Sequence, residues 1–288
     1  MIKDFSSWLE YQGASEGSGR SEKLWLVNPE NKAIGLFKFT KSDYTTEHIS
    51  EKIAMQLAKL IDIECMEVEI GKYNNRVGSL SYRINDDDEN LIEGIQLINK
   101  YYPNYNPETL YDDINKEYYS LEMILNSLSD YDFCREFLKI PVFDFLIGNT
   151  DRHQNNWAIL QNEIERLCPL YDNGSSLCCY IKENNIDDYL GNDKVRFNSI
   201  IDTKSTSRIR VDKYIKKEPA QLNVLKFMRE YYYEDIIDIV YKIINNITEK
   251  NIDNILREYI GLISEKRIIL IKKFLIGKII LLREVFNI

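Results

Sequence analysis

The stretch GNTDRHQNNWAIL at residues 148–160, followed by PLYDNGSSL at 169–177, concentrates small polar side chains between apolar segments. The apolar segment before it, residues 134–147, is typical of a helix that Gly148-Asn149 would end, and Pro141 predicts a kink in that helix. Asn and Asp are ordinary turn formers and helix caps, so each of them taken alone has a structural explanation. So many of them within a few residues need a joint explanation, which depends on how the chain folds at this point.

Two short strands are predicted after this helix, at 157–160 and 166–171, joined by a turn at 161–165. If the centre of the hairpin is near residue 164, Asn156 lies opposite Asp172, and cross-strand neighbours have Cβ atoms roughly 4.5–5.5 Å apart. An amide oxygen and a carboxylate at that separation can share an Mg²⁺ ion, which prefers hard oxygen ligands.

Asp151 lies five residues before Asn156, and D-x-x-x-x-N followed by Asp172-Asn173-Gly174 is the spacing of a protein-kinase active site. Phosphoryl transfer needs a carboxylate that orients the substrate hydroxyl and accepts its proton. It also needs an amide and a second carboxylate that hold the metal beside it. The spacing therefore predicts Asp151 as the catalytic base and Asn156 and Asp172 as metal ligands.

The remaining pattern indicates an α+β fold of two lobes, as in protein kinases. Before the acidic run NDDDEN, which predicts a boundary, strands dominate, and beyond it helices such as 91–102 and the amphipathic segment 268–282 dominate. The expected elements and lobes are a hairpin over 23–39, a helix over 45–61 capped by Thr45 or Thr46, a hairpin over 65–84 turning at Asn74-Asn75, a long loop over 183–218, a small β-rich lobe 1–85 and a larger helical lobe 86–288.

The wording N-T-D-R-H-x-x-N with the following Asp172 resembles the C-terminal kinase domain of HipA-like proteins, especially the compact CtkA-type serine/threonine kinases. The resemblance is specific over about 142–177 and fainter in the N-terminal lobe. It implies a kinase that uses ATP and Mg²⁺ to phosphorylate a Ser or Thr hydroxyl of a protein. It matches Asp151 to the catalytic base, Asn156 and Asp172 to the metal ligands, and His153 to the motif histidine. We group His153 with Asp151 and Lys38 as a candidate catalytic residue, although we expect it to brace the loop rather than perform chemistry.

Such a kinase needs a cation on the phosphates. Ile34, Leu36 and Lys38 share one face of the predicted strand, so the two apolar residues can cover adenine while the Lys38 ammonium reaches the α/β-phosphates. Glu51, on the following helix, is expected to pair with Lys38, as the corresponding glutamate does in kinases.

The glycine- and serine-rich segment 12–23 is expected to cover the phosphates, although a plain flexible loop explains its composition equally well. The predicted contacts to ATP are Gly13, Ala14, Ser15, Gly17, Ser18 and Lys23 in this loop, and Tyr82, Arg83 and Ile84 at the hinge. The resemblance also implies autophosphorylation of serines in this loop, of which Ser15, Ser18 and Ser21 are the candidates.

Composition disfavours other classes of protein. Two histidines and no C-x-x-C spacing disfavour a zinc hydrolase, and no dense basic stripe indicates direct binding of nucleic acid. Lysines interrupt the most apolar segment, which argues against a membrane span. The five cysteines and the N-terminus without an apolar region favour a cytoplasmic location, which leaves secretion as an effector open, and a monomer is expected.

Two alternatives stay open. A small-molecule phosphotransferase of the aminoglycoside or choline kinase type shares the D-x-x-x-x-N and Asp-x-Gly chemistry, although the N-T-D-R-H wording favours the HipA-like group. A non-catalytic pseudokinase that serves as an interaction module is the other. Among HipA-like kinases, toxins with an antitoxin partner are common, whereas the compact type resembles stand-alone effectors acting on a protein substrate.

Overall fold

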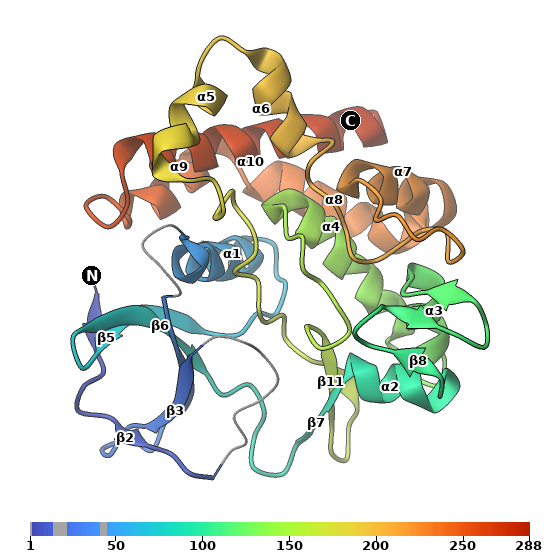
Figure 1. The fold of residues 1–288 in the computed structure, drawn as a ribbon, viewed down its shortest axis with the longest axis horizontal. Helices are drawn as coiled ribbons and strands as arrows, with labels where there is room; N and C mark the ends of the chain where they lie inside the picture. Colours follow the sequence, from blue (N-terminus) through green and yellow to red (C-terminus); the bar gives the residue numbers. More distant parts are fainter. Residues whose placement is uncertain (1, 14–21, 41–44) are drawn as a thin grey trace.

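The computed structural model describes residues 2–13, 22–40 and 45–288. Its first part is a six-stranded sheet in the order β1-β5-β6-β4-β3-β2, antiparallel except for the β1–β5 pair. In Figure 1 helix α1 lies between this sheet and the C-terminal helices. The elements are β1 (Lys3–Asp4), β2 (Leu9–Glu10), β3 (Lys23–Val27), β4 (Ile34–Phe39), α1 (Glu47–Leu60), β5 (Val68–Tyr73) and β6 (Arg76–Tyr82).

Both predicted hairpins of this sheet are confirmed. In β3–β4, Lys23 lies opposite Lys38. In β5–β6, the turn residues Asn74 and Asn75 have φ angles of 49° and 65°. Two consecutive left-handed residues define the type I′ turn, whose twist matches that of antiparallel strands and which asparagine tolerates.

Helix α1 is confirmed, but its predicted cap is wrong. The side chains of Ile49, Ile53 and Leu57 are buried, as their spacing predicts. Thr46 occupies the N-cap position without making a side-chain cap, and its Oγ1 is buried with no hydrogen-bond partner among the described residues. The helix is thus stabilised by packing rather than by a cap.

Residues 91–102 are not one helix. The chain first forms strand β7 (Asn90–Glu93), which pairs with β11 (Ala158–Gln161), and only then helix α2 (Gly94–Tyr101). The prediction is wrong here because strand pairing with a distant segment overrides local helical periodicity. The acidic run separates β6 from β7.

Most of the remaining chain is helical, and the α+β class is confirmed. The predicted loop 183–218 is wrong in its first half, where α5 and α6 form and bury Ile186, Phe197 and Ile201. The elements are β8 (Tyr105–Asn106), β9 (Tyr111–Asp112), β10 (Glu117–Tyr118), α3 (Leu121–Ser127), η1 (Cys134–Leu138), α4 (Lys139–Ile147), β12 (Arg166–Leu167), η2 (Glu183–Asn185), α5 (Ile186–Leu190), α6 (Lys194–Ile201), α7 (Gln221–Tyr231), α8 (Tyr233–Asn246), α9 (Glu249–Arg257) and α10 (Glu265–Phe286).

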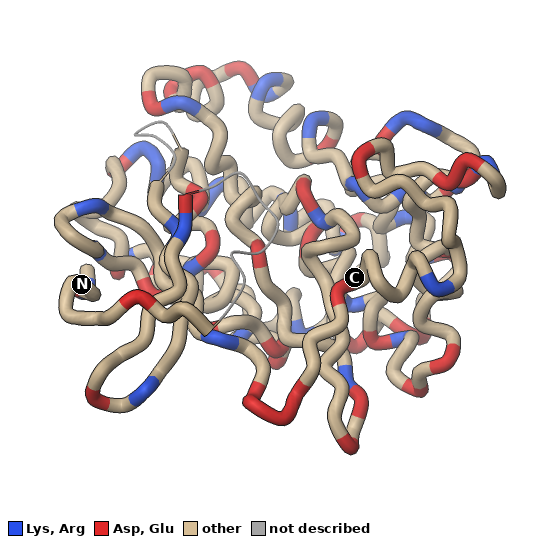
Figure 2. The backbone as a smooth tube through the Cα atoms, turned by 60° about the horizontal axis from the view of Figure 1, so that its bottom comes forward, with Lys and Arg blue, Asp and Glu red and all other residues tan. Residues whose placement is uncertain are grey.

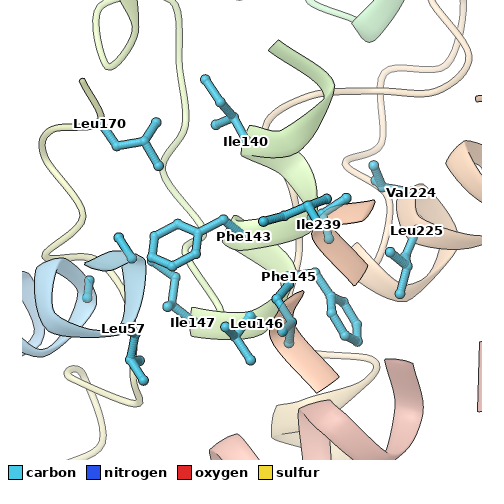
Figure 3. Close-up of a cluster of buried hydrophobic side chains, with 14 of the residues drawn as sticks. Leu57, Ile140, Phe143, Phe145, Leu146, Ile147, Leu170, Val224, Leu225 and Ile239 are labelled. Atoms are coloured by element: carbon cyan, nitrogen blue, oxygen red, sulfur yellow. The ribbon is translucent and has the colours of Figure 1, made fainter. Parts of the chain in front are cut away.

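Helix α4 runs through the centre of the main core. Every residue from 140 to 147 is buried, and Figure 3 shows its side chains packed against Leu57 of α1, Leu225 of α7 and Ile239 of α8. The predicted helix over 134–147 is divided into two helices, and Pro141 lies near the division. The preceding 3₁₀ helix η1 passes into α4 at Lys139, and Pro141 lies in the first turn, where a backbone N–H has no helical partner to lose.

The predicted amphipathic segment 268–282 lies within α10. Its Lys272 forms ion pairs with Glu249 and Asp253, whereas its Lys278 is fully buried. Within the described ranges, no helix combines the length and the apolar character that a membrane crossing requires.

Candidate active site

Helix α4 ends where the polar stretch begins. Gly148, as predicted, closes the helix in the left-handed conformation with φ 67°. A Cβ at this position would lie 2.5 Å from Cζ of Phe274, so the turn has room only for glycine. The chain thereby leaves the core and enters the loop 149–157.

Arg152 holds this loop together and was not predicted as a site residue. Its guanidinium is 1% exposed and binds both carboxylate oxygens of Asp144 in α4, at 3.0 and 2.7 Å. The same group donates to the backbone carbonyls of Asn156 and Tyr171 and to Oδ1 of Asn173. Burial alone would lower the pKa of Arg152, but the Asp144 carboxylate raises it, so the charge is retained.

The side chain of Asn156, the predicted metal ligand, binds the backbone of Asp151, the predicted base. Nδ2 of Asn156 donates to the Asp151 carbonyl at 2.7 Å, which turns the Oδ1 acceptor away from the loop backbone. The Asp151 side chain is 38% exposed and accepts a hydrogen bond from Nε of Arg208 at 3.2 Å. The Asn156 side chain thus fixes the backbone that carries Asp151, whose carboxylate is partly open to solvent.

His153 braces the loop. Its Nδ1 accepts a hydrogen bond from the Asn155 amide at 3.2 Å, and its own amide donates to the Asp151 carbonyl at 2.8 Å. These contacts fix the turn that carries Asp151. They favour the bracing role over the catalytic role with which His153 was grouped.

The structure places Asp172 near this loop by a route that differs from the prediction. Ile159 pairs with Leu167 and Leu160 with Arg166, so the hairpin turns about residue 163 and Asn156 does not face Asp172 across it. After Cys168 the chain leaves β11, and Leu170 pairs instead with Cys65. The cross-strand argument is therefore wrong; Arg152, which binds the carbonyls of Asn156 and Tyr171, joins the two sites instead.

Lys38 and Asp172 form an ion pair between the N-terminal sheet and the second metal-ligand candidate. Lys38 Nζ lies 2.7 Å from Asp172 Oδ1, and the side chains are 28% and 43% exposed, so a ligand can reach both. The Lys38 charge lowers the pKa of Asp172 below its ordinary value and thus keeps the carboxylate ionised. Asp172 has φ 55°, a left-handed conformation that aspartate adopts more readily than most residues.

Glu51 is placed next to this pair, but its hydrogen bond differs from the predicted pairing with Lys38. Oε1 of Glu51 accepts a hydrogen bond from the Asn173 amide at 2.8 Å. The Glu51 charge acts on Lys38 at longer range and raises the pKa of its ammonium group. Burial raises the pKa of Glu51 to about 6, against the opposing effect of Lys38. Glu51 therefore fixes the backbone that follows Asp172.

The predicted adenine face is consistent with the fold. Ile34, Leu36 and Lys38 are half-buried and alternate with the buried residues Gly35, Phe37 and Phe39. Lys23 lies opposite Lys38 in the β3–β4 register, so both lysines project from the same face.

Two residues of the predicted hinge, Tyr82 and Arg83, use their backbone amides in hydrogen bonds to other parts of the chain. The Arg83 amide donates to the Ile34 carbonyl and the Tyr82 amide to the Glu67 carbonyl, while Ile84 packs beside Ala158 and Leu160. Of the predicted loop contacts, Gly13 precedes the gap in the described residues, and Ala14, Ser15, Gly17, Ser18 and Ser21 lie outside the described residues.

The donor set suits a magnesium ion that shares its shell with phosphate. Within residues 2–13, 22–40 and 45–288, no cluster of three or more His, Cys, Asp or Glu side chains forms an all-protein metal site. Asp172 offers a carboxylate, and Asn156 offers an amide oxygen, since its Nδ2 is already bound to the Asp151 carbonyl. Mg²⁺ characteristically takes one or two carboxylates and completes its shell with phosphate oxygens and water.

A model of the HipA-like C-terminal domain family matches residues 15–231. In fold, the chain is similar to the crystal structure of a Helicobacter pylori proinflammatory kinase, CtkA, with TM-score 0.84 and 19% identity, covering 100% of this chain and 97% of that one. It is also similar to HipA of Shewanella oneidensis MR-1, solved with HipB and operator DNA, with TM-score 0.57 and 16% identity, covering 97% and 68%. Among curated proteins, no sequence matches. The kinase-like fold is confirmed.

Proposed function

The chain belongs to the HipA-like C-terminal domain family, as the N-T-D-R-H motif indicates, and we propose that it is an ATP- and Mg²⁺-dependent protein kinase that phosphorylates a Ser or Thr hydroxyl. The observation that carries the proposal is the ion pair of 2.7 Å between Lys38 and Asp172, together with an Asp151 carboxylate that solvent reaches. The candidate cation and metal ligand thus come from separate parts of the chain and are in contact, and Arg152 links the backbone before Asp172 to the loop that carries the candidate base.

Each residue has a distinct role in this proposal. Asp151 orients the substrate hydroxyl and accepts its proton as the oxygen attacks the γ-phosphate. Asn156 and Asp172 would hold Mg²⁺, which neutralises phosphate charge when bound. Lys38, with Lys23 beside it in register, binds the phosphates. Arg152 touches none of the reacting atoms and acts as a positioning residue through its bonds to both halves of the site.

The test is transfer of ³²P from labelled ATP to a mixture of soluble proteins. Asp151→Ala and Asp172→Ala should each lower transfer by about three orders of magnitude or more while the fold persists, because such groups act as a unit. Asp130→Ala is a matched control, since Asp130 forms an exposed ion pair with Lys100 on α2. Equal, negligible transfer by the wild type and Asp151→Ala would favour the pseudokinase alternative.

A parallel screen separates the second alternative. Aminoglycosides, choline and related hydroxyl compounds replace protein as acceptor in the same assay. Saturable transfer to one of them, without transfer to protein, would refute the protein-kinase proposal in favour of a small-molecule phosphotransferase.

The biological setting we propose is that of a toxin or effector kinase acting in the cytoplasm or after secretion. The HipA relative was solved as part of a toxin–antitoxin system with HipB, which supports looking for a small antitoxin partner here. Purification of the tagged chain from its own cells, followed by mass spectrometry, tests for such a partner. Phosphopeptide mapping of residues 12–23 after incubation with ATP tests autophosphorylation at Ser15, Ser18 and Ser21.

A further inference from the structure

The segment between α6 and α7 has an unusual charge. Residues 204–217 contain six Lys or Arg and a single Asp, in a chain whose net charge is −9. Figure 2 shows the two signs interspersed over much of the rest of the chain. A local run of positive charges in an acidic protein favours the binding of a negatively charged partner at that surface.

A buried arginine folds this segment into a compact loop. The Arg210 guanidinium donates to the Arg208 carbonyl at 3.0 Å and to the Lys216 carbonyl at 3.1 and 2.9 Å. The backbone at residues 208 and 216 is therefore held together, as at the base of an Ω-loop. Lys213 forms ion pairs with Glu117 and Glu122 at 2.8 Å, which fastens the loop to β10 and α3.

One side of this loop lies against the candidate base. Arg208 Nε donates to Oδ1 of Asp151 at 3.2 Å, and its Nη1 donates to Glu218 at 2.8 Å. The Arg208 side chain nevertheless stays 40% exposed. A substrate whose hydroxyl reaches Asp151 must therefore pass beside this guanidinium.

The tip of the loop is apolar and cationic. Tyr214 and Ile215 are 65% and 52% exposed, and Lys216 and Lys217 follow them on the surface. Exposed aromatic and aliphatic side chains next to unpaired lysines are suited to a polypeptide that offers both apolar contact and carboxylates. Lys216 and Lys217 have no ion pair within the described part of the chain.

We propose that residues 208–217 form the substrate-docking loop of the kinase and select a Ser or Thr hydroxyl flanked by Asp or Glu. This inference rests on the proposed function and names its substrate class. Arg208 contacts the carboxylate nearest the acceptor hydroxyl. Lys216 and Lys217 contact carboxylates further along the substrate, and Tyr214 and Ile215 cover its apolar side chains.

The test compares three peptide sets, in which a central Ser or Thr is flanked by Glu and Asp, by Ala and Gln, or by Lys and Arg. The wild type should show a higher kcat/KM for the acidic set than for the neutral set. Lys216→Glu/Lys217→Glu should lower kcat/KM for the acidic set by about tenfold, because opposite charges now repel, and bring it close to the neutral set.

The matched control is Lys226→Glu/Arg229→Glu on α7, which makes the same change in net charge on another exposed surface. It should retain the acidic preference. Absence of an acidic preference in the wild type, or an equal loss in both double variants, would overturn the docking proposal.

A binding measurement keeps this inference separate from the proposed function. Fluorescence anisotropy of a labelled acidic peptide should show tighter binding to the wild type than to Lys216→Glu/Lys217→Glu, whether or not phosphate is transferred. Failure of transfer with intact binding refutes the kinase proposal alone. Displacement of the peptide by a single-stranded RNA of equal charge at lower concentration would assign the loop to nucleic acid and overturn its role in docking protein.

Discussion

Replacing Arg152 by Met should destabilise the protein more than any surface change. The guanidinium makes five hydrogen bonds at an almost fully buried position, two of them to the Asp144 carboxylate. Removing one partner of a buried ion pair leaves the other charge uncompensated, which costs about 3–5 kcal/mol. Since domains are stable by only about 5–15 kcal/mol, we expect Arg152→Met to lie near the threshold of unfolding.

Urea unfolding followed by tryptophan fluorescence measures this change, because Trp157 is buried just after the loop that Arg152 holds. The control is Arg135→Met. Arg135 is 60% exposed and lies 3.3 Å from Asp235, so its loss should change the free energy of unfolding by about 1 kcal/mol or less.

A second variant separates the charge from the packing. Asp144→Leu/Arg152→Met removes both charges, so it should be more stable than Arg152→Met alone, because no uncompensated carboxylate is left in the core. An Arg152→Met protein within about 1 kcal/mol of the wild type would refute the reasoning. A double variant less stable than the single one would show that the hydrogen bond from Asn149 Nδ2 to Asp144, which only the double variant loses, outweighs the relief of the buried charge.

Three further predictions concern buried ionisable groups and backbone geometry. Burial raises the pKa of Glu51 to about 6 from its ordinary 4.5, so between these pH values the folded state holds a proton that the unfolded state has lost. The free energy of unfolding therefore falls as the pH rises through that window. Glu51→Gln should abolish this fall and be more stable than the wild type by about 2 kcal/mol at pH 7, as measured by urea unfolding at several pH values. Burial lowers the pKa of Lys278 from 10.5 to about 7, so the unfolded state binds more protons between these values and stability should rise with pH there; a Lys278→Met chain that keeps the full rise would contradict this assignment. Gly148→Ala should lower the melting temperature far more than Gly261→Ala: both have positive φ, but only at Gly148 would the new Cβ meet another side chain, that of Phe274.

Features determined by local backbone geometry were predictable from the sequence. Asn74-Asn75 identifies a hairpin turn because few residues tolerate two successive left-handed conformations, and both adopt them. Gly148 identifies the end of α4 for the same reason. The spacing of Asp151 and Asn156 likewise describes one short loop, in which the Asn156 amide does bind the Asp151 backbone.

Features that depend on distant partners were not predictable in the same way. The hairpin after Trp157 ends early because Leu170 pairs with Cys65, which lies between α1 and β5. No sequence pattern near residue 170 predicts this competing strand pairing. Arg152 was missed as a site residue, yet one signal pointed to it. Asp144 is the single charge in the apolar segment IPVFDFLI, and a buried carboxylate requires a buried cation.

Two of the ion pairs of the site, Arg152–Asp144 and Lys38–Asp172, differ in a way that suits their proposed roles. Arg152–Asp144 is almost fully buried and satisfied by further hydrogen bonds, so breaking it is costly and the loop that carries Asp151 and Asn156 keeps one geometry. Lys38–Asp172 is partly exposed, and solvent weakens the attraction, so exchanging this contact for phosphate and metal contacts costs about 1 kcal/mol. In the proposed kinase, a permanent pair therefore fixes the loop of the candidate base, while an exchangeable pair keeps the candidate cation and metal ligand next to each other for a nucleotide. Had the burial of the two pairs been reversed, nucleotide binding would have to break a buried charge pair, and the base would rest on a loop held only by a solvent-exposed contact.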